Sequence, residues 1–158
     1  MANRSILTRS ISTIAPFLHR SPLIPHTSWV HPSAIVEGDV ELGEHVSVWP
    51  LTAIRGDVNQ IKIGNKSNIQ DGCVLLVRGN YEGKQIGQGL YIGESVSVGH
   101  KACLHACTIE SRTLIGIGSI VLDGAMIREG TLVAAGALIP PGKVCEAGLW
   151  AGCPAKRY

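Results

Sequence analysis

The sequence is poor in aromatic and charged residues. Of its 158 residues, 4% are aromatic and 16% are charged. The net charge is only +2 and the basic residues form no run, which argues against a nucleic-acid partner. No apolar run reaches about 18 residues, so we expect no membrane-spanning helix. The five Cys residues lack metal-type spacing and indicate reduced thiols rather than structural disulfide bonds.

The sequence is instead rich in aliphatic residues and glycine. Hydrophobic residues account for 45% of the chain, and 19 Gly and 8 Pro accompany them. A disordered Gly- and Pro-rich chain would not carry so many apolar residues. The length suits a single domain of ordinary size.

The first residues differ chemically from the rest. Acidic residues are absent from residues 1–36, which contain Arg4, Arg9 and Arg20. An apolar helical stripe is predicted there at Leu7, Ile11, Ile14 and Leu18. This composition is typical of a mitochondrial targeting segment. We therefore expect residues 1–28 to be an N-terminal extension, either a targeting segment or a linker. The alternative is a retained helix that lies on a partner or a membrane surface.

From Val30 onward, one aliphatic residue recurs every six positions in four runs, which are separated by a three-residue slip, a longer gap and a one-residue deletion. All seventeen members are Ile, Val or Leu: Val30, Val36, Leu42, Val48, Ile54, Ile63, Ile69, Leu75, Ile92, Val98, Leu104, Ile109, Ile115, Val121, Ile127, Val133 and Ile139. A period of six fits neither an α-helix nor an ordinary strand meander. It predicts a parallel β-helix of hexapeptide repeats over residues 29–158. Seventeen units would make between five and six triangular coils.

Two further positions support this architecture. Four residues beyond every aliphatic except the last lies a small or β-branched residue, for example Ala34, Val58 and Thr108, which we expect to fill a corner. Glycine often follows the aliphatic directly, and we expect it to supply turn dihedrals that other residues resist. These glycines are Gly43, Gly64, Gly93, Gly99 and Gly116. The rhythm is lost over residues 78–91, which predicts an external loop.

Two histidines are the first candidates for a metal-binding or catalytic role. His100 and His105 lie close together in VGHKACLHAC, but on successive faces of a triangular coil. One chain could not easily bring both imidazoles to one ion, whereas two neighbouring chains could. A catalytic zinc normally has three protein ligands and an open position. Spacing alone leaves open that both are interface histidines hydrogen-bonded to neighbours.

Several longer segments resemble the γ-class carbonic anhydrase family and its mitochondrial relatives. They are RGDVNQIKIGNKSNIQDGCVL, IGESVSVGHKACLHACTIESRTLIGIGSIVLDGAMI, GALIPPGK and LWAGCPAK, within a match from about Trp29 to Arg157. The resemblance implies an all-β fold, a left-handed parallel β-helix, assembled as a trimeric prism. It also implies a zinc ion in each cleft between chains, held by three histidines, and hydration of carbon dioxide.

By this resemblance His105 would be a zinc ligand on its own chain, and His100 would reach into the neighbouring cleft. The third ligand position is Leu76, where the family usually has histidine. Leu76 and His105 each follow their unit's aliphatic by one residue, so we expect them to stack on one face. Leucine has no lone pair, so the site is incomplete unless the thiolate of Cys73 or Cys107 stands in. Zinc is then expected only in a cleft shared with another chain.

The other family motifs are present. Arg55 and Asp57 resemble the family's interface pair, and Gln70 and Asp71 resemble residues beside the metal-bound water. Their alternative role is structural, as an ion pair that fixes trimer register and as polar lining of a wet cleft.

The resemblance predicts a non-catalytic subunit, on the matrix side of the inner mitochondrial membrane, in a trimer or heterotrimer of γ-carbonic anhydrase family chains. The expected partners are membrane-arm subunits of respiratory complex I, with no nucleic acid. One alternative is an active zinc-dependent enzyme that converts carbon dioxide to bicarbonate. Another is a hexapeptide-repeat acyltransferase.

Overall fold

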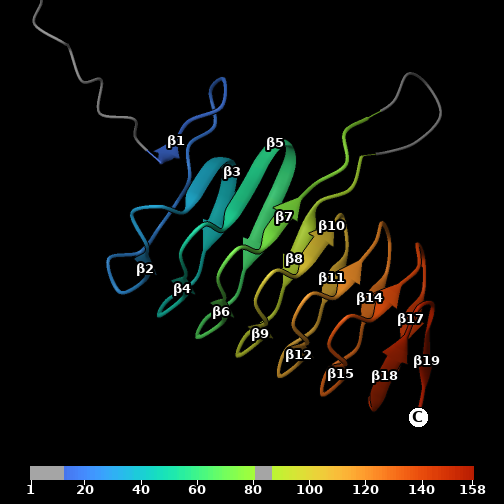
Figure 1. The fold of residues 1–158 in the computed structure, drawn as a ribbon. Coiled ribbons are helices and arrows are strands. Elements are labelled where there is room, and N and C mark those ends of the chain that lie inside the picture. Colours follow the sequence, from blue (N-terminus) through green and yellow to red (C-terminus); the bar gives the residue numbers. More distant parts are fainter. Residues whose placement is uncertain (1–12, 81–86) are drawn as a thin grey trace, which may run out of the picture.

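The computed structural model describes residues 13–80 and 87–158. These residues form a left-handed parallel β-helix, which confirms the predicted fold class. Short strands stack into three flat faces along one axis (Figure 1). Each face is named here by one buried residue, Ile54, Ile63 or Ile69.

The Ile54 face begins with β1 (Ile14–Ala15). Its other strands are the first part of β3 (Ile35–Leu42), the first part of β5 (Ala53–Ile63), β7 (Val74–Leu76), β10 (Cys103–His105), β13 (Ile120–Val121) and β16 (Leu138–Ile139). β3 and β5 continue around a corner onto the Ile63 face. That face also contains β8 (Leu90–Ile92), β11 (Thr108–Ile109), β14 (Met126–Ile127) and β17 (Val144–Cys145).

The Ile69 face has seven parallel rungs. They are β2 (Trp29–Val30), β4 (Ser47–Val48), β6 (Asn68–Ile69), β9 (Ser97–Val98), β12 (Leu114–Ile115), β15 (Leu132–Val133) and β18 (Leu149–Gly152). β19 (Ala155–Arg157) folds back antiparallel on β18. The estimate of five to six coils is therefore too low. The last rungs were missed because Cys145 and Trp150, rather than Ile, Val or Leu, occupy their interior positions.

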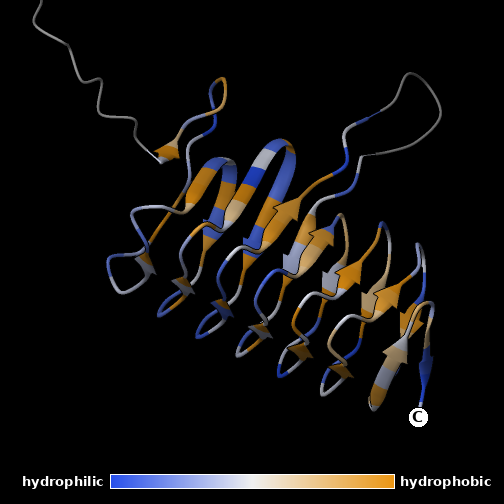
Figure 2. Ribbon diagram, in the orientation of Figure 1, coloured by the Kyte–Doolittle hydropathy of each residue, from blue (hydrophilic) through white to orange (hydrophobic). Residues whose placement is uncertain are grey.

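The interior is a ladder of aliphatic side chains. All but one of the seventeen predicted residues are buried, and Val30 packs half-buried against this core. Figure 2 shows hydrophobic residues repeating on the strands of successive rungs, with hydrophilic residues gathered at many of the corners. Each such side chain contributes about 1.5–3 kcal/mol when it is fully removed from water. The stack also satisfies the backbone, for example where Trp29 N donates to Val46 O at 2.8 Å.

Two of the three corner residues named as examples are wrong. Val58 is 54% exposed, because the segment between Gly56 and Ile61 bulges outward and Ile61 fills the interior instead. Thr108 lies outward in β11, and Cys107 occupies the buried corner. Both errors follow from insertions or deletions that shift the period by a few residues.

The five glycines that follow an aliphatic have a different role from the one expected. None has a positive φ; that conformation occurs at other glycines, such as Gly118 (φ +65°). A Cβ on Gly116 would lie 2.6 Å from both Val133 O and Ala134 C of the next rung. These positions are glycine because the backbone of the adjacent coil passes too close for any side chain.

The described part of the N-terminal segment lies on the prism. Ile14 pairs in register with Val36, and Leu23 forms a bridge to Glu41. The predicted helical stripe is therefore wrong at Ile14, which is in a strand, and at Leu18, which has φ +53°. Leu7 and Ile11 lie outside the described residues. The targeting role of residues 1–28 stays a prediction.

The predicted loop leaves the prism after β7. Arg78 and Gln88 form an antiparallel bridge at its base, and residues 81–86 lie outside the described part of the chain. Among the described residues, no helix is long and apolar enough to cross a membrane.

Candidate functional site

One half of the candidate site lies at the edge where the strands of the Ile54 face end. Arg55, Leu76 and His105 are direct register partners on β5, β7 and β10. Each follows a buried residue of the core, so its side chain points outward. The prediction that Leu76 and His105 stack on one face is confirmed.

This column opens into a groove of about 370 Å³. Its polar lining includes Arg55, Asp57 and His105, and Leu76 lies among them. Arg55 Nε lies 3.0 Å from Asp57 Oδ2, and the backbone N–H of Val58 donates to the other carboxylate oxygen at 2.9 Å. The predicted Arg–carboxylate pair therefore forms within the chain, while its interface role stays a prediction.

Asp123 and Arg78 also belong to this half-site, and the sequence analysis missed them. Asp123 Oδ1 lies 2.5 Å from His105 Nδ1, and Asp123 Oδ2 lies 3.3 Å from Arg78 Nη1. Asp123 comes 18 residues after His105, which is about one coil later at the same corner. That spacing was the available signal, because residues one coil apart stack on one another.

The other half-site lies at the edge where the strands of the Ile54 face begin. Gln70 and Asp71 precede β7, and His100 precedes β10. Together with Trp49 and Asn68 they line a hollow of about 210 Å³. His100 Nδ1 lies 3.0 Å from Asp71 Oδ2, with about half of each side chain exposed.

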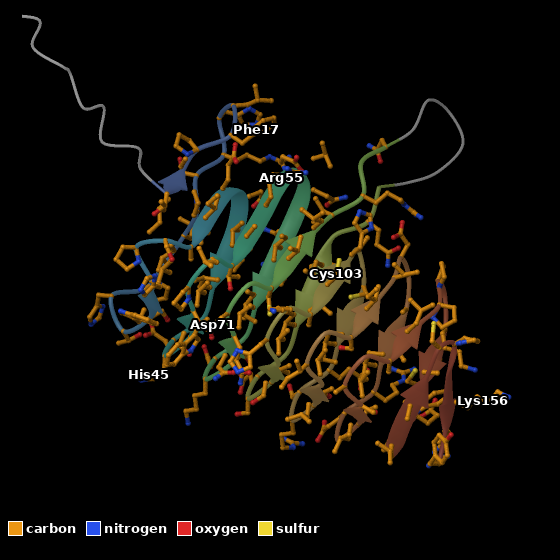
Figure 3. The ribbon with its side chains drawn as sticks, in the orientation of Figure 1. Phe17, His45, Arg55, Asp71, Cys103 and Lys156 are labelled. Atoms are coloured by element: carbon orange, nitrogen blue, oxygen red, sulfur yellow. The ribbon has the colours of Figure 1, made fainter. Side chains whose placement is uncertain are left out.

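The two half-sites lie at opposite edges of the Ile54 face. They share no lining residue, and Figure 3 shows Asp71 and Arg55 at opposite ends of the strands. The described residues contain no group of three or more His, Cys, Asp or Glu placed to hold a metal ion. The residues of one chain therefore do not fit a catalytic zinc, which needs three ligands around one point.

The two cysteines considered as replacement ligands are unsuited to that role. Burial raises the pKa of the Cys73 thiol to about 11, and it raises the pKa of Cys107 still further. Both residues are fully buried, and Cys73 Sγ donates to Gly99 O at 3.2 Å. Both therefore remain neutral thiols that pack in the core.

The fold and the two half-sites define a class, the hexapeptide-repeat β-helix proteins with clefts at the prism edges. No family model matches the chain. Protein YrdA of Escherichia coli is 48% identical over 91% of this chain and 79% of its own length. Gamma carbonic anhydrase 2, mitochondrial, of Arabidopsis thaliana is 39% identical over 91% of this chain and 52% of its own length.

Solved structures agree with this class. A hexapeptide transferase family protein from Anaplasma phagocytophilum has a TM-score of 0.85 and 38% identity, covering 93% of this chain and 83% of its own. A putative acetyltransferase from Bacillus cereus also has a TM-score of 0.85, with 39% identity over 92% of this chain and 81% of its own. The chain belongs to the γ-carbonic-anhydrase-like family of hexapeptide-repeat proteins.

Proposed function

We propose that this chain is a γ-carbonic-anhydrase-like trimer subunit that does not hydrate carbon dioxide on its own. Leu76 carries this proposal. It stands in register between Arg55 and His105, at the position where the family resemblance expects a histidine ligand. An alkyl side chain there leaves a homotrimer cleft with two imidazoles instead of three. Zinc would then be held only where this chain gives His100 to a cleft in which a neighbouring family chain supplies the other two histidines.

The placement of the half-sites supports a cyclic assembly. They lie at opposite edges of one face, so the strand-end edge of one copy can meet the strand-start edge of the next. The face between them is apolar on its outer surface. Ile35 is 49% exposed and Ile120 is 39% exposed, and Cys103 of the same outward column is half-buried. Removing this surface from water would stabilise the trimer.

The test compares zinc content and carbon dioxide hydration in the purified full chain. We expect little zinc and no activity in the wild type, and one zinc per cleft in Leu76→His. Leu114→His is the matched control, because Leu114 is also an outward leucine, 45% exposed, on the Ile69 face. One zinc per chain in the wild type would overturn the proposal and favour the active enzyme.

The cellular setting is a separate part of the proposal. We place the trimer on the matrix side of the inner mitochondrial membrane, bound to the membrane arm of complex I. Two observations support this location. The N-terminal segment contains Arg but no acidic residue, and the chain is 39–40% identical to two proteins named as mitochondrial. Co-migration of this chain with NADH dehydrogenase on native gels of source cells is expected. A free trimer without that complex would overturn this part alone, and the 48% identity with a bacterial protein favours that outcome.

The names of the solved relatives favour an acyltransferase as the second candidate. Two neighbours are named as transferases, and PerB from Caulobacter crescentus, 27% identical with a TM-score of 0.67, was solved with CoA and GDP-perosamine. Calorimetric titration with coenzyme A separates the candidates. The trimer-subunit proposal expects no binding, whereas saturable binding would support a transferase.

A further inference from the structure

The carboxylate of Asp123 links His105 to Arg78. One oxygen lies 2.5 Å from His105 Nδ1, and the other lies 3.3 Å from Arg78 Nη1. The side chains of Asp123 and His105 are 26% and 31% exposed, so this contact is better shielded than that of Asp71 with His100, at 44% and 48%. Shielding from water strengthens a hydrogen bond to a carboxylate.

We propose that Asp123 is a positioning residue that holds neutral His105 as the Nδ1–H tautomer. An ionised carboxylate can only accept hydrogen bonds, so the facing ring nitrogen must carry the proton. His105 lines the groove beside Leu76 and Asp123 does not, so Nε2 is the nitrogen left for the groove. Arg78 fixes the carboxylate from its far side.

The expected effect of Asp123 on zinc binding rests on the proposed function. The tautomer of His105 does not. The chain retains an imidazole whose Nε2 lone pair is oriented into the groove, although the adjacent position lacks a donor. Carboxylates behind ligand histidines orient the ring and raise its basicity, and their loss typically weakens metal binding by about 10–100-fold. Asp123 would therefore set how strongly zinc is held in a cleft that Leu76→His has completed.

The first experiment needs no metal. Nitrogen NMR of the full chain with ¹⁵N-labelled histidine distinguishes protonated from unprotonated ring nitrogens. We expect His105 to show a protonated Nδ1 and a bare Nε2 in the wild type. Asp123→Asn should change this pattern, because an amide can donate to Nδ1. Glu110→Gln, the same loss of charge in a carboxylate paired with Arg128 outside both half-sites, should leave the His105 signals unaltered. A bare Nδ1 in the wild type, or an unchanged pattern in Asp123→Asn, would overturn the proposal.

The second experiment measures zinc affinity in the Leu76→His background. Adding Asp123→Asn should weaken zinc binding by about 10–100-fold. Arg78→Gln should weaken it less, since the carboxylate remains. Equal affinity with and without Asp123 would contradict the positioning role. If Leu76→His itself binds no zinc, the proposed reason for inactivity fails, while the tautomer measurement still decides the role of Asp123.

Discussion

Because the coils stack closely, we expect any side chain at Gly116 to destabilise the fold. This residue follows β12, and its N–H donates to Val133 O of the next rung at 2.8 Å. An added Cβ would lie 2.6 Å from that same oxygen. The neighbour is backbone held by ladder hydrogen bonds, so it cannot move away without weakening the rung. We expect Gly116→Ala to lower the free energy of unfolding by about 1–3 kcal/mol, the usual cost of overpacking.

Gly118 provides the matched control two residues later. Its φ is +65° and a Cβ there would meet nothing within 4 Å, so its requirement for glycine is conformational rather than steric. Gly118→Ala should cost about 1–2 kcal/mol. Asparagine tolerates this left-handed conformation, so Gly118→Asn should cost less than Gly118→Ala. At Gly116 we expect the opposite order. Gly116→Asn should cost more stability than Gly116→Ala, because asparagine is larger than alanine.

Urea unfolding of the four variants at one protein concentration gives the comparison, since an oligomer's apparent stability depends on concentration. Equal m-values would show that only stability has changed. The reasoning would be refuted if Gly116→Ala unfolded at the wild-type midpoint. It would also be refuted if Gly116→Asn were more stable than Gly116→Ala, which is the order expected only at Gly118.

Three further predictions concern the core, a buried thiol and the N-terminal rungs. Leu104→Ala, at a fully buried position, should cost about 2–5 kcal/mol in urea unfolding, whereas Leu114→Ala should change stability by about 0.5 kcal/mol or less; equal effects would contradict the assigned interior. Because burial raises the pKa of Cys73 from 9.0 to about 11, the neutral thiol stabilises the fold fully below pH 9, and that contribution is lost as the pH rises from 9 through 11. Urea midpoints across this range should fall less steeply in Cys73→Ala than in the wild type, and parallel curves would contradict the assignment. Deleting residues 1–25 should lower the melting temperature, because Ile14 and Leu23 pair with β3, and an unchanged melting temperature would make that segment a mere linker.

The sequence was sufficient to predict the repeat because the interior of a hexapeptide coil accepts so few side chains. Every predicted aliphatic from Val36 to Ile139 is buried, and Leu76 pairs with His105 as the spacing required. The rungs that escaped detection are those in which another residue type occupies the interior. Trp150 fills the last rung, and the described N-terminal residues reach the prism without the six-residue spacing.

Contacts between coils were harder to predict than positions within a coil. The reason for Gly116 lies in the backbone of the next rung, which a reading along one coil does not include. Asp123 was overlooked for the same reason, since it reaches His105 from the following coil. A loop or a short deletion alters the distance between stacked residues, so these pairs follow only when the length of each coil is known.

The outward position of Leu76 separates this residue from the core that maintains the fold. Its side chain points outward from β7 and is half-buried, whereas its neighbour Leu75 is fully buried in the core. Exchanging leucine and histidine at position 76 should therefore leave the interior ladder undisturbed, while under the proposed function it would add or remove a zinc ligand. A TM-score of 0.85 to a protein named as a transferase reflects that ladder and says little about the outward column. Under the proposed function, a few outward residues at the edges of the Ile54 face would decide whether the reaction occurs.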